Sequence, residues 1–202
     1  DILDISDPEN PAMVKQIPLG LTGGPNSVAV FGGLVAVALE DQDKTEKGIV
    51  AFFDTDGNLL ETVEVGSLPD MLTFSPDGTK LVVANEGEAD GDVDPEGSIS
   101  IIDQSEGLDD LDVKHVDFTA FNGREEEYRE KGIRLFEGKS IAEDLEPEYI
   151  AIAPDGKTAM VTLQEANALA LLDLEAGVIQ ELIPLGLKDY SEDYRLDASD
   201  KD

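Results

Sequence analysis

The chain has 202 residues, of which 41% are hydrophobic and only 5% aromatic, and it contains neither Trp nor Cys. Its 46 Asp and Glu outnumber its 14 Lys and Arg, which gives a formal net charge of −32 at pH 7. Such a polyanion repels phosphates, so nucleic acid is excluded as a partner. Its apolar runs are too short to span a bilayer, so no membrane insertion is expected, and the absence of Cys excludes disulfides and thiolate chemistry.

The chain opens with residues 1–20, which contain two short apolar stretches, Asp1 to Ile5 and Met13 to Leu19. Residues 25–66 then predict four strands. Two of these flank a Gly-Gly turn, a third runs from Gly48 to Asp54, and a fourth follows another turn. Val and Ile are frequent in these stretches and favour strands, because branched side chains pack well on a pleated surface.

The same pattern of four predicted strands returns in residues 69–118 and 147–186. In both segments the first two strands flank a Pro-Asp-Gly turn. Its Pro presets one dihedral angle, and its Gly accepts a positive φ. The third strand of each segment ends in Asp, at Asp103 and Asp173. Four antiparallel strands per repeat are the unit of a β-propeller blade.

Residues 1–20 match the third and fourth strands of this unit, so we interpret them as an outer half-blade. The predicted fold is therefore all-β, an incomplete propeller of about three and a half four-stranded antiparallel blades. Closed propellers have at least about four blades, so further blades of the same polypeptide are the expected partner.

Residues 119–146 interrupt the repeat, because the spacing from Pro69 to Pro147 is much longer than the spacing from Pro25 to Pro69. Residues 124–132 predict a short charged helix that ends at a C-cap glycine. We expect a partly helical insertion that lies on the acidic face of the propeller. Four side chains are expected to attach it: Phe121, Tyr128, Ile133 and Phe136.

The acidic face follows from blade topology. The loop between strands two and three shares one face with the blade-to-blade connection, and these are the long acidic segments. Long loops on one face of a rigid scaffold are where function usually lies. The candidate binding residues on this face are Asp70, Glu86, Glu148, Gln164, Glu165 and Asn167. Asp70 and Glu148 follow the prolines that open the innermost strands, so we expect them near the central channel.

The loop from Glu86 to Glu96 is a candidate calcium site, because hard oxygen ligands at alternate positions suit Ca²⁺. Its candidate ligands are Asp90, Asp92, Asp94 and Glu96. The loop is not an EF-hand, since the sixth position counted from Asp90 is Pro95 where an EF-hand has Gly. Two alternatives are a solvated acidic loop and a carboxylate pair that performs acid–base work.

No nucleophile elbow or phosphate-binding loop is present, and the one histidine, His115, lies in a predicted outer strand. No catalytic residue is therefore assigned. We expect a non-catalytic module that acts as a scaffold or binds a cell-surface protein or small ligand through its acidic face. The alternatives are part of a secreted metal-dependent hydrolase of phosphatase or esterase type, and a quinoprotein-type or redox propeller.

Leu68 to Gly78 and Leu81 to Glu88 resemble YVTN-type propeller repeats. Together with residues 94–103, 145–151 and 161–170, they resemble the choice-of-anchor I domain of secreted and surface-attached bacterial proteins, some of whose relatives are labelled alkaline-phosphatase-like. This resemblance implies a seven-bladed type of propeller, often beside anchoring or hydrolase domains. It also implies a location that is extracellular, at the cell surface or periplasmic. It supplies no catalytic residues.

Overall fold

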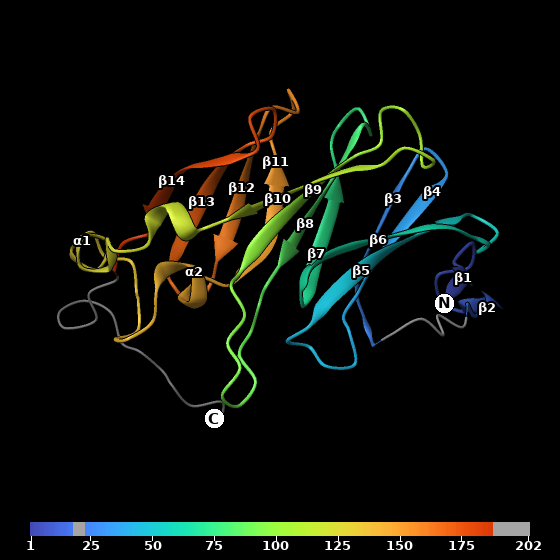
Figure 1. The fold of residues 1–202 in the computed structure, drawn as a ribbon. Coiled ribbons are helices and arrows are strands. Elements are labelled where there is room, and N and C mark those ends of the chain that lie inside the picture. The colour runs from blue at the N-terminus through green and yellow to red at the C-terminus, as the bar shows by residue number, and fades with distance from the viewer. Residues whose placement is uncertain (18–22, 188–202) are drawn as a thin grey trace.

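The computed structural model describes residues 1–17 and 23–187. The end of the first predicted segment, residues 18–20, lies outside this part. One two-stranded and three four-stranded antiparallel sheets stand side by side, and each sheet is built from consecutive strands (Figure 1). The predicted fold class, an all-β incomplete propeller, is confirmed.

The sheets follow one another in chain order. The half-blade consists of β1 (Ile2–Asp4) and β2 (Ala12–Lys15). Blade 1 consists of β3 (Pro25–Phe31), β4 (Leu34–Leu39), β5 (Lys47–Asp54) and β6 (Leu59–Ser67). Blade 2 consists of β7 (Pro69–Phe74), β8 (Lys80–Asn85), β9 (Ser98–Asp103) and β10 (Asp112–Asp117). Blade 3 consists of β11 (Pro147–Ile152), β12 (Thr158–Leu163), β13 (Ala168–Asp173) and β14 (Val178–Pro184).

Local turn chemistry sets the strand ends. The Pro-Asp-Gly turns place Gly78 at φ 73° and Gly156 at φ 70°, a region that disfavours residues with a Cβ. The aspartates that end the third strands accept hydrogen bonds from the backbone of the following turn. Asp103 Oδ1 lies 2.9 Å from the amide N of Ser105, and Asp173 Oδ1 lies 3.0 Å from that of Glu175. These side chains stabilise the turns that the repeat predicts.

The core lies between the blades. Successive side chains of a strand point to opposite faces, and in the middle blade both faces are covered. Leu81 and Val83 of β8 pack toward blade 1, whereas Val82 and Ala84 pack toward blade 3. This double burial explains why the strands are apolar at almost every position.

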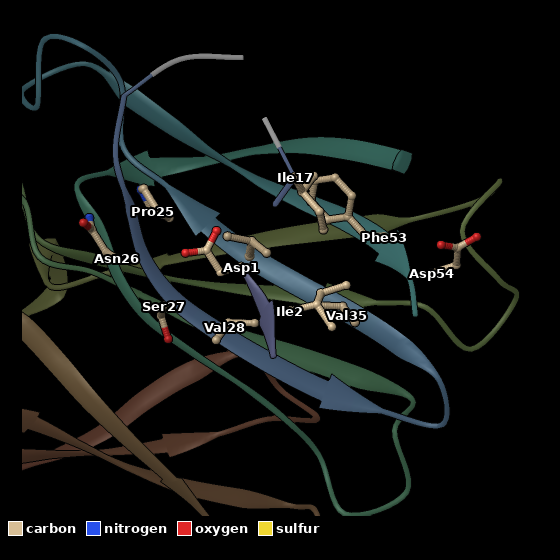
Figure 2. A pocket seen from close by; sticks show the side chains of 11 residues that line it. Asp1, Ile2, Ile17, Pro25, Asn26, Ser27, Val28, Val35, Phe53 and Asp54 are labelled. Carbon is tan, nitrogen blue, oxygen red and sulfur yellow. The ribbon is translucent and has the colours of Figure 1, made fainter. Parts of the chain in front are cut away.

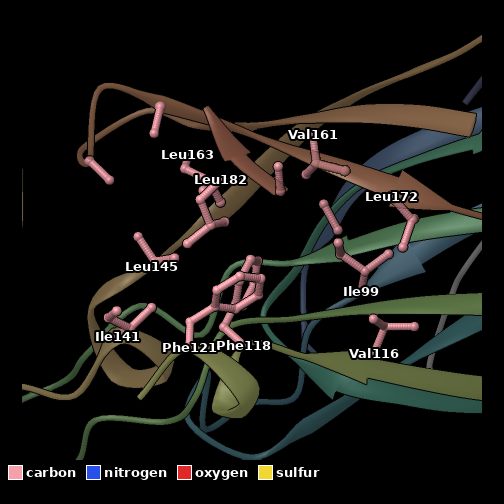
Figure 3. Close-up of a cluster of buried hydrophobic side chains, with 14 of the residues drawn as sticks. Ile99, Val116, Phe118, Phe121, Ile141, Leu145, Val161, Leu163, Leu172 and Leu182 are labelled. Atoms are coloured by element: carbon pink, nitrogen blue, oxygen red, sulfur yellow. The ribbon is translucent and has the colours of Figure 1, made fainter. Parts of the chain in front are cut away.

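The insertion contains a 3₁₀ turn, η1 (Thr119–Phe121), and two short helices, α1 (Glu125–Glu130) and α2 (Ile141–Asp144). Gly132 follows α1 with φ 98°. At the start of α2 the side chains and amides of Ser140 and Glu143 bond reciprocally in a capping box. In Figure 3 the side chains of Phe118, Phe121, Ile141 and Leu145 lie in one cluster with those of blades 2 and 3.

The expectation that Phe136 attaches the insertion to the propeller is wrong. Phe121, Tyr128 and Ile133 are buried as expected, but Phe136 is 53% exposed and the guanidinium of Arg134 lies 4.6 Å from its ring centroid. The neighbouring Leu135 is buried instead. In an extended segment adjacent side chains point in opposite directions, so only one of this pair can face the core.

Different connecting segments lie at the two ends of the sheets. The turn between β7 and β8 and the turn between β11 and β12 lie at one end, whereas the β8–β9 loop and α2 lie at the other (Figure 1). The residues that the structure describes form no helix that is long and apolar enough to cross a membrane.

Candidate functional site

The innermost strands β3, β7 and β11 each begin with a proline, and the residues that follow are Asn26, Asp70 and Glu148. β7 packs against both β3 and β11. Asn26 Nδ2 donates a hydrogen bond of 3.2 Å to the carbonyl of Pro69 and so ties blade 1 to blade 2. Asp70 and Glu148 occupy the same place in the next two blades, at the inner edge of the acidic face.

Glu86 lies at the centre of this group, directly after β8. Burial raises the pKa of Glu86 to about 7, and the charges of four neighbouring carboxylates, those of Asp70, Glu88, Glu146 and Glu148, contribute further. Each of these charges favours the protonated form of Glu86. Two of the four belong to blade 2 or its loop and two stand at the start of β11, so the repulsion acts across the junction of blades 2 and 3.

The other members of the group are perturbed in the same direction. Burial raises the pKa of Asp70, of Glu146 and of Glu148, and the charge of Glu165 adds to this effect at the last two. Within residues 1–17 and 23–187, neither Lys nor Arg forms an ion pair with Asp70, Glu86 or Glu148. We call Asp70, Glu86, Glu146, Glu148 and Glu165 the acidic junction.

Two lysines border the acidic junction. Lys44, in the β4–β5 turn of blade 1, lies 2.6 Å from Glu88 Oε2, and this hydrogen bond raises the pKa of Lys44. Lys139, in the insertion, lies 2.8 Å from Asp94 Oδ2, and this bond raises the pKa of Lys139. Both cations are held by loop carboxylates outside the acidic junction, so the negative charge at the centre is only partly compensated.

The predicted calcium ligands do not converge. The backbones of Asp90 and Val93 pair in a tight turn with N–O distances of 2.9 and 3.1 Å, with Gly91 at φ 61°. Asp90, Asp92 and Glu96 are exposed, whereas Asp94 is partly buried and bound to Lys139. In the described ranges no group of three or more His, Cys, Asp or Glu is arranged to hold a metal ion. Calcium at this loop therefore stays a prediction.

The three candidates in the β12–β13 turn have different roles. Gln164 accepts a backbone hydrogen bond of 3.1 Å from Asn167. Asn167 itself has φ 52° and donates through Nδ2 to the carbonyl of Gly186 at 2.8 Å. Both residues shape the turn, and only the carboxylate of Glu165 belongs to the acidic junction. Glu146 was missed from the sequence, although a Glu on each side of Pro147 is a visible signal.

His115 takes part in a chain of side-chain hydrogen bonds that joins neighbouring strands. Its Nδ1 lies 3.1 Å from Ser100 Oγ, which also accepts a hydrogen bond of 3.0 Å from Asn85 Nδ2. Ser100 and Asn85 are completely buried, so this serine hydroxyl cannot reach a substrate. The chain of three side chains links β8, β9 and β10.

Several solved structures are similar to this chain. A functionally unknown protein from Desulfotomaculum acetoxidans is 14% identical with a TM-score of 0.56, over 90% of this chain and 49% of that one. The β-propeller domain of Cps50 (Swd1) from Myceliophteria thermophila is 11% identical with a TM-score of 0.54, over 82% and 42%. A eukaryotic initiation factor is 14% identical with a TM-score of 0.53, over 85% and 34%. The chain thus spans half or less of the length of these structures, and the likeness shows the fold alone.

No curated protein matches the sequence. The profile of the choice-of-anchor I domain, by contrast, matches residues 1–202. This match agrees with the blade repeats, with the propeller fold and with the resemblance carried by the paired stretches around Pro69 and Pro147. The chain belongs to the choice-of-anchor I domain family.

Proposed function

We propose that this β-propeller is a non-catalytic, extracellular module that binds a positively charged ligand or protein surface at the acidic junction. The observation that carries the proposal is the group of carboxylates around Glu86, which come from two blades and have raised pKa values. Like charges held together and partly buried are unfavourable unless a cation compensates them. The extracellular location rests on the family resemblance, which implies secreted and surface-attached proteins.

The chemistry of the site favours binding over catalysis. A hydrolase of the metal-dependent type needs carboxylates that hold a metal and activate a water molecule. In the part of the chain that the structure describes, no observation favours such a centre. The carboxylates of the acidic junction do suit a Lys- or Arg-rich partner, because complementary charges steer association and set specificity.

The test uses a fluorescent tetralysine peptide and its binding to the wild-type protein at two salt concentrations. A triple variant, Asp70→Asn, Glu86→Gln and Glu148→Gln, should bind the peptide about tenfold more weakly. A control that also replaces three carboxylates, Glu106→Gln, Asp109→Asn and Glu175→Gln, alters turns at the opposite end and should bind like wild type. Equal weakening in both variants would mean that only net charge attracts the peptide, and the proposal would fail.

A further inference from the structure

A ligand held at the acidic junction needs a contact besides charge. Complementary charges mainly steer association and set specificity, whereas aromatic and Arg side chains contribute most of the affinity of an interface. An apolar hollow of about 340 Å³ lies between the half-blade and blade 1 (Figure 2). Its Val35, Val37 and Phe53 belong to the cluster that contains Ile17, which follows β2. The hollow is therefore apart from the acidic junction, which spans blades 2 and 3.

The insertion, by contrast, holds an exposed ring on a fixed backbone. Phe136 is 53% exposed, whereas its neighbour Leu135 is buried. The amide of Phe136 donates a hydrogen bond of 2.7 Å to Asp144 Oδ2, and its carbonyl accepts one of 2.7 Å from Arg129 Nη2. Arg129 Nε also donates to the carbonyl of Leu135 at 3.0 Å. A side chain on such a preorganised backbone loses little conformational freedom when a partner binds.

Arg134 fixes the ring of Phe136 to blade 3. Its guanidinium lies 4.6 Å from the ring centroid, a cation–π contact. The amide of Arg134 donates to the carbonyl of Ala166 at 2.9 Å, and its Nη1 donates to the carbonyl of Glu165 at 3.0 Å. Both acceptors belong to the β12–β13 turn, so this turn sets the position of the guanidinium and of the ring beneath it.

These contacts place Phe136 beside the acidic junction from two directions. Glu165, whose carbonyl binds Arg134, also carries one of the carboxylates of the acidic junction. Asp144, whose Oδ2 binds the amide of Phe136, lies two residues before Glu146. Burial raises the pKa of Glu146, and the charges of Glu165 and Asp144 add to this effect. The exposed ring and the carboxylates therefore belong to one surface that a single bound segment can contact.

Arg134 also determines which group of a ligand suits the ring. The guanidinium is permanently charged and already occupies one face of Phe136. A cation of the ligand would be repelled there, and the carboxylates of the acidic junction attract it instead. An aromatic side chain carries no charge and packs favourably against an exposed ring.

We propose that the acidic junction binds a segment of a partner protein in which a Lys or Arg stands within two residues of an aromatic side chain. The cation binds among the carboxylates, and the aromatic side chain packs against Phe136. This inference rests on the proposed function, which supplies the site for the cation. It adds Phe136 as the residue that selects the sequence next to that cation.

The test is a double-mutant cycle between the full chain and fluorescent peptides. Tetralysine is extended by Gly-Phe at its C-terminus or by Phe-Gly at its N-terminus, and each peptide is compared with one that has Ala in place of Phe. The wild type should bind at least one Phe peptide about fivefold more tightly than its Ala counterpart. In Phe136→Ala this preference should disappear, while the Ala peptides bind as they do to the wild type.

Phe31→Ala is the matched control, because Phe31 is 39% exposed and lies at the β3–β4 turn, at the opposite end of the blades. It should keep the preference for Phe. The inference is overturned if the wild type shows no preference, or if Phe136→Ala retains it. Tetralysine binding that depends on Asp70, Glu86 and Glu148 would then still uphold the proposed function. Absence of that dependence would overturn the proposed function and this inference with it.

Discussion

Lys139 Nζ and Asp94 Oδ2 lie 2.8 Å apart and join the insertion to the β8–β9 loop. Asp94 is the least exposed of the four predicted calcium ligands. Its other oxygen, Oδ1, is buried and has no hydrogen-bond partner. A divalent cation at the predicted site would compete with Lys139 for this carboxylate.

Calcium should act more strongly when this lysine is removed. We expect millimolar calcium to raise the Tm of Lys139→Met by more than it raises that of the wild type, because binding to the folded state alone stabilises it. At a calcium concentration ten times the Kd the gain is about 1.4 kcal/mol, or about 3–5 °C for a domain of this size. Differential scanning fluorimetry measures the shift, with NaCl of equal ionic strength as the control. Equal shifts with both salts in both proteins would reject a calcium site at this loop.

The pKa of Glu86 predicts how stability depends on pH. Its folded-state pKa of about 7 lies above the ordinary value of 4.5, so the folded state holds the proton more tightly. Stability should therefore fall as the pH rises through this window. Glu86→Gln cannot ionise, so it should exceed the wild type in unfolding free energy by about 1 kcal/mol at pH 8, after allowance for solvent screening, and equal it at pH 4.

Urea unfolding at the two pH values tests this expectation, with Glu130→Gln as a charge-matched control. Glu130 is exposed on α1, away from the acidic junction, and its substitution should change stability by less than about 0.5 kcal/mol at either pH. A gain for Glu86→Gln that is the same at pH 4 and pH 8 would contradict the assignment of the effect to ionisation.

The insertion should be part of the cooperative core. Phe121 is only 7% exposed in the cluster shared by blades 2 and 3, whereas Phe136 is 53% exposed. Phe121→Ala should cost about 3–5 kcal/mol, as expected for a large cavity. Phe136→Ala should cost less than about 1 kcal/mol. Chemical denaturation followed by circular dichroism compares the two, and similar losses would show that the insertion packs differently.

Gly177 tests the contact between the outer strand of blade 2 and blade 3. Both Gly177 and Gly107 occupy β-turns with positive φ, at 58° and 98°, but a Cβ at Gly177 would lie 2.4 Å from Lys114 Cδ while one at Gly107 meets nothing within 4 Å. Gly177→Ala should therefore destabilise the protein by about 1 kcal/mol more than Gly107→Ala. Thermal melts measure this difference. The added substitution Lys114→Ala should remove it, because contacting residues are energetically coupled.

The blades could be predicted because the residues that set their strand ends act on neighbouring residues in the sequence. A Pro-Asp-Gly turn and an aspartate at the end of each third strand set strand ends through hydrogen bonds to nearby backbone groups. The direction of a side chain in an irregular segment is not a local property. Either Leu135 or Phe136 could have faced the core, and tertiary packing chose Leu135.

The candidate site likewise has one part that the sequence predicts and one part that it does not. Asp70 and Glu148 were predictable because they follow the prolines that open the innermost strands, and the repeat places those prolines together. The pairing of Lys139 with Asp94 was not predictable, since both residues lie in segments that no repeat relates. Alternating carboxylates in a sequence show which oxygen atoms a loop can use as ligands. Which cation binds them depends on the other segments that the fold places beside the loop.

Repulsion at the acidic junction acts between Asp70 and Glu86 on one side and Glu146 and Glu148 on the other, so it pushes two neighbouring blades apart. A cation bound there would draw these blades together. Thermodynamic reciprocity then requires that whatever holds the blades together must also tighten cation binding by the same factor. Closure of the ring and affinity for the ligand are thus linked quantities, and an open arc should be a weaker receptor than the closed propeller that carries the same carboxylates.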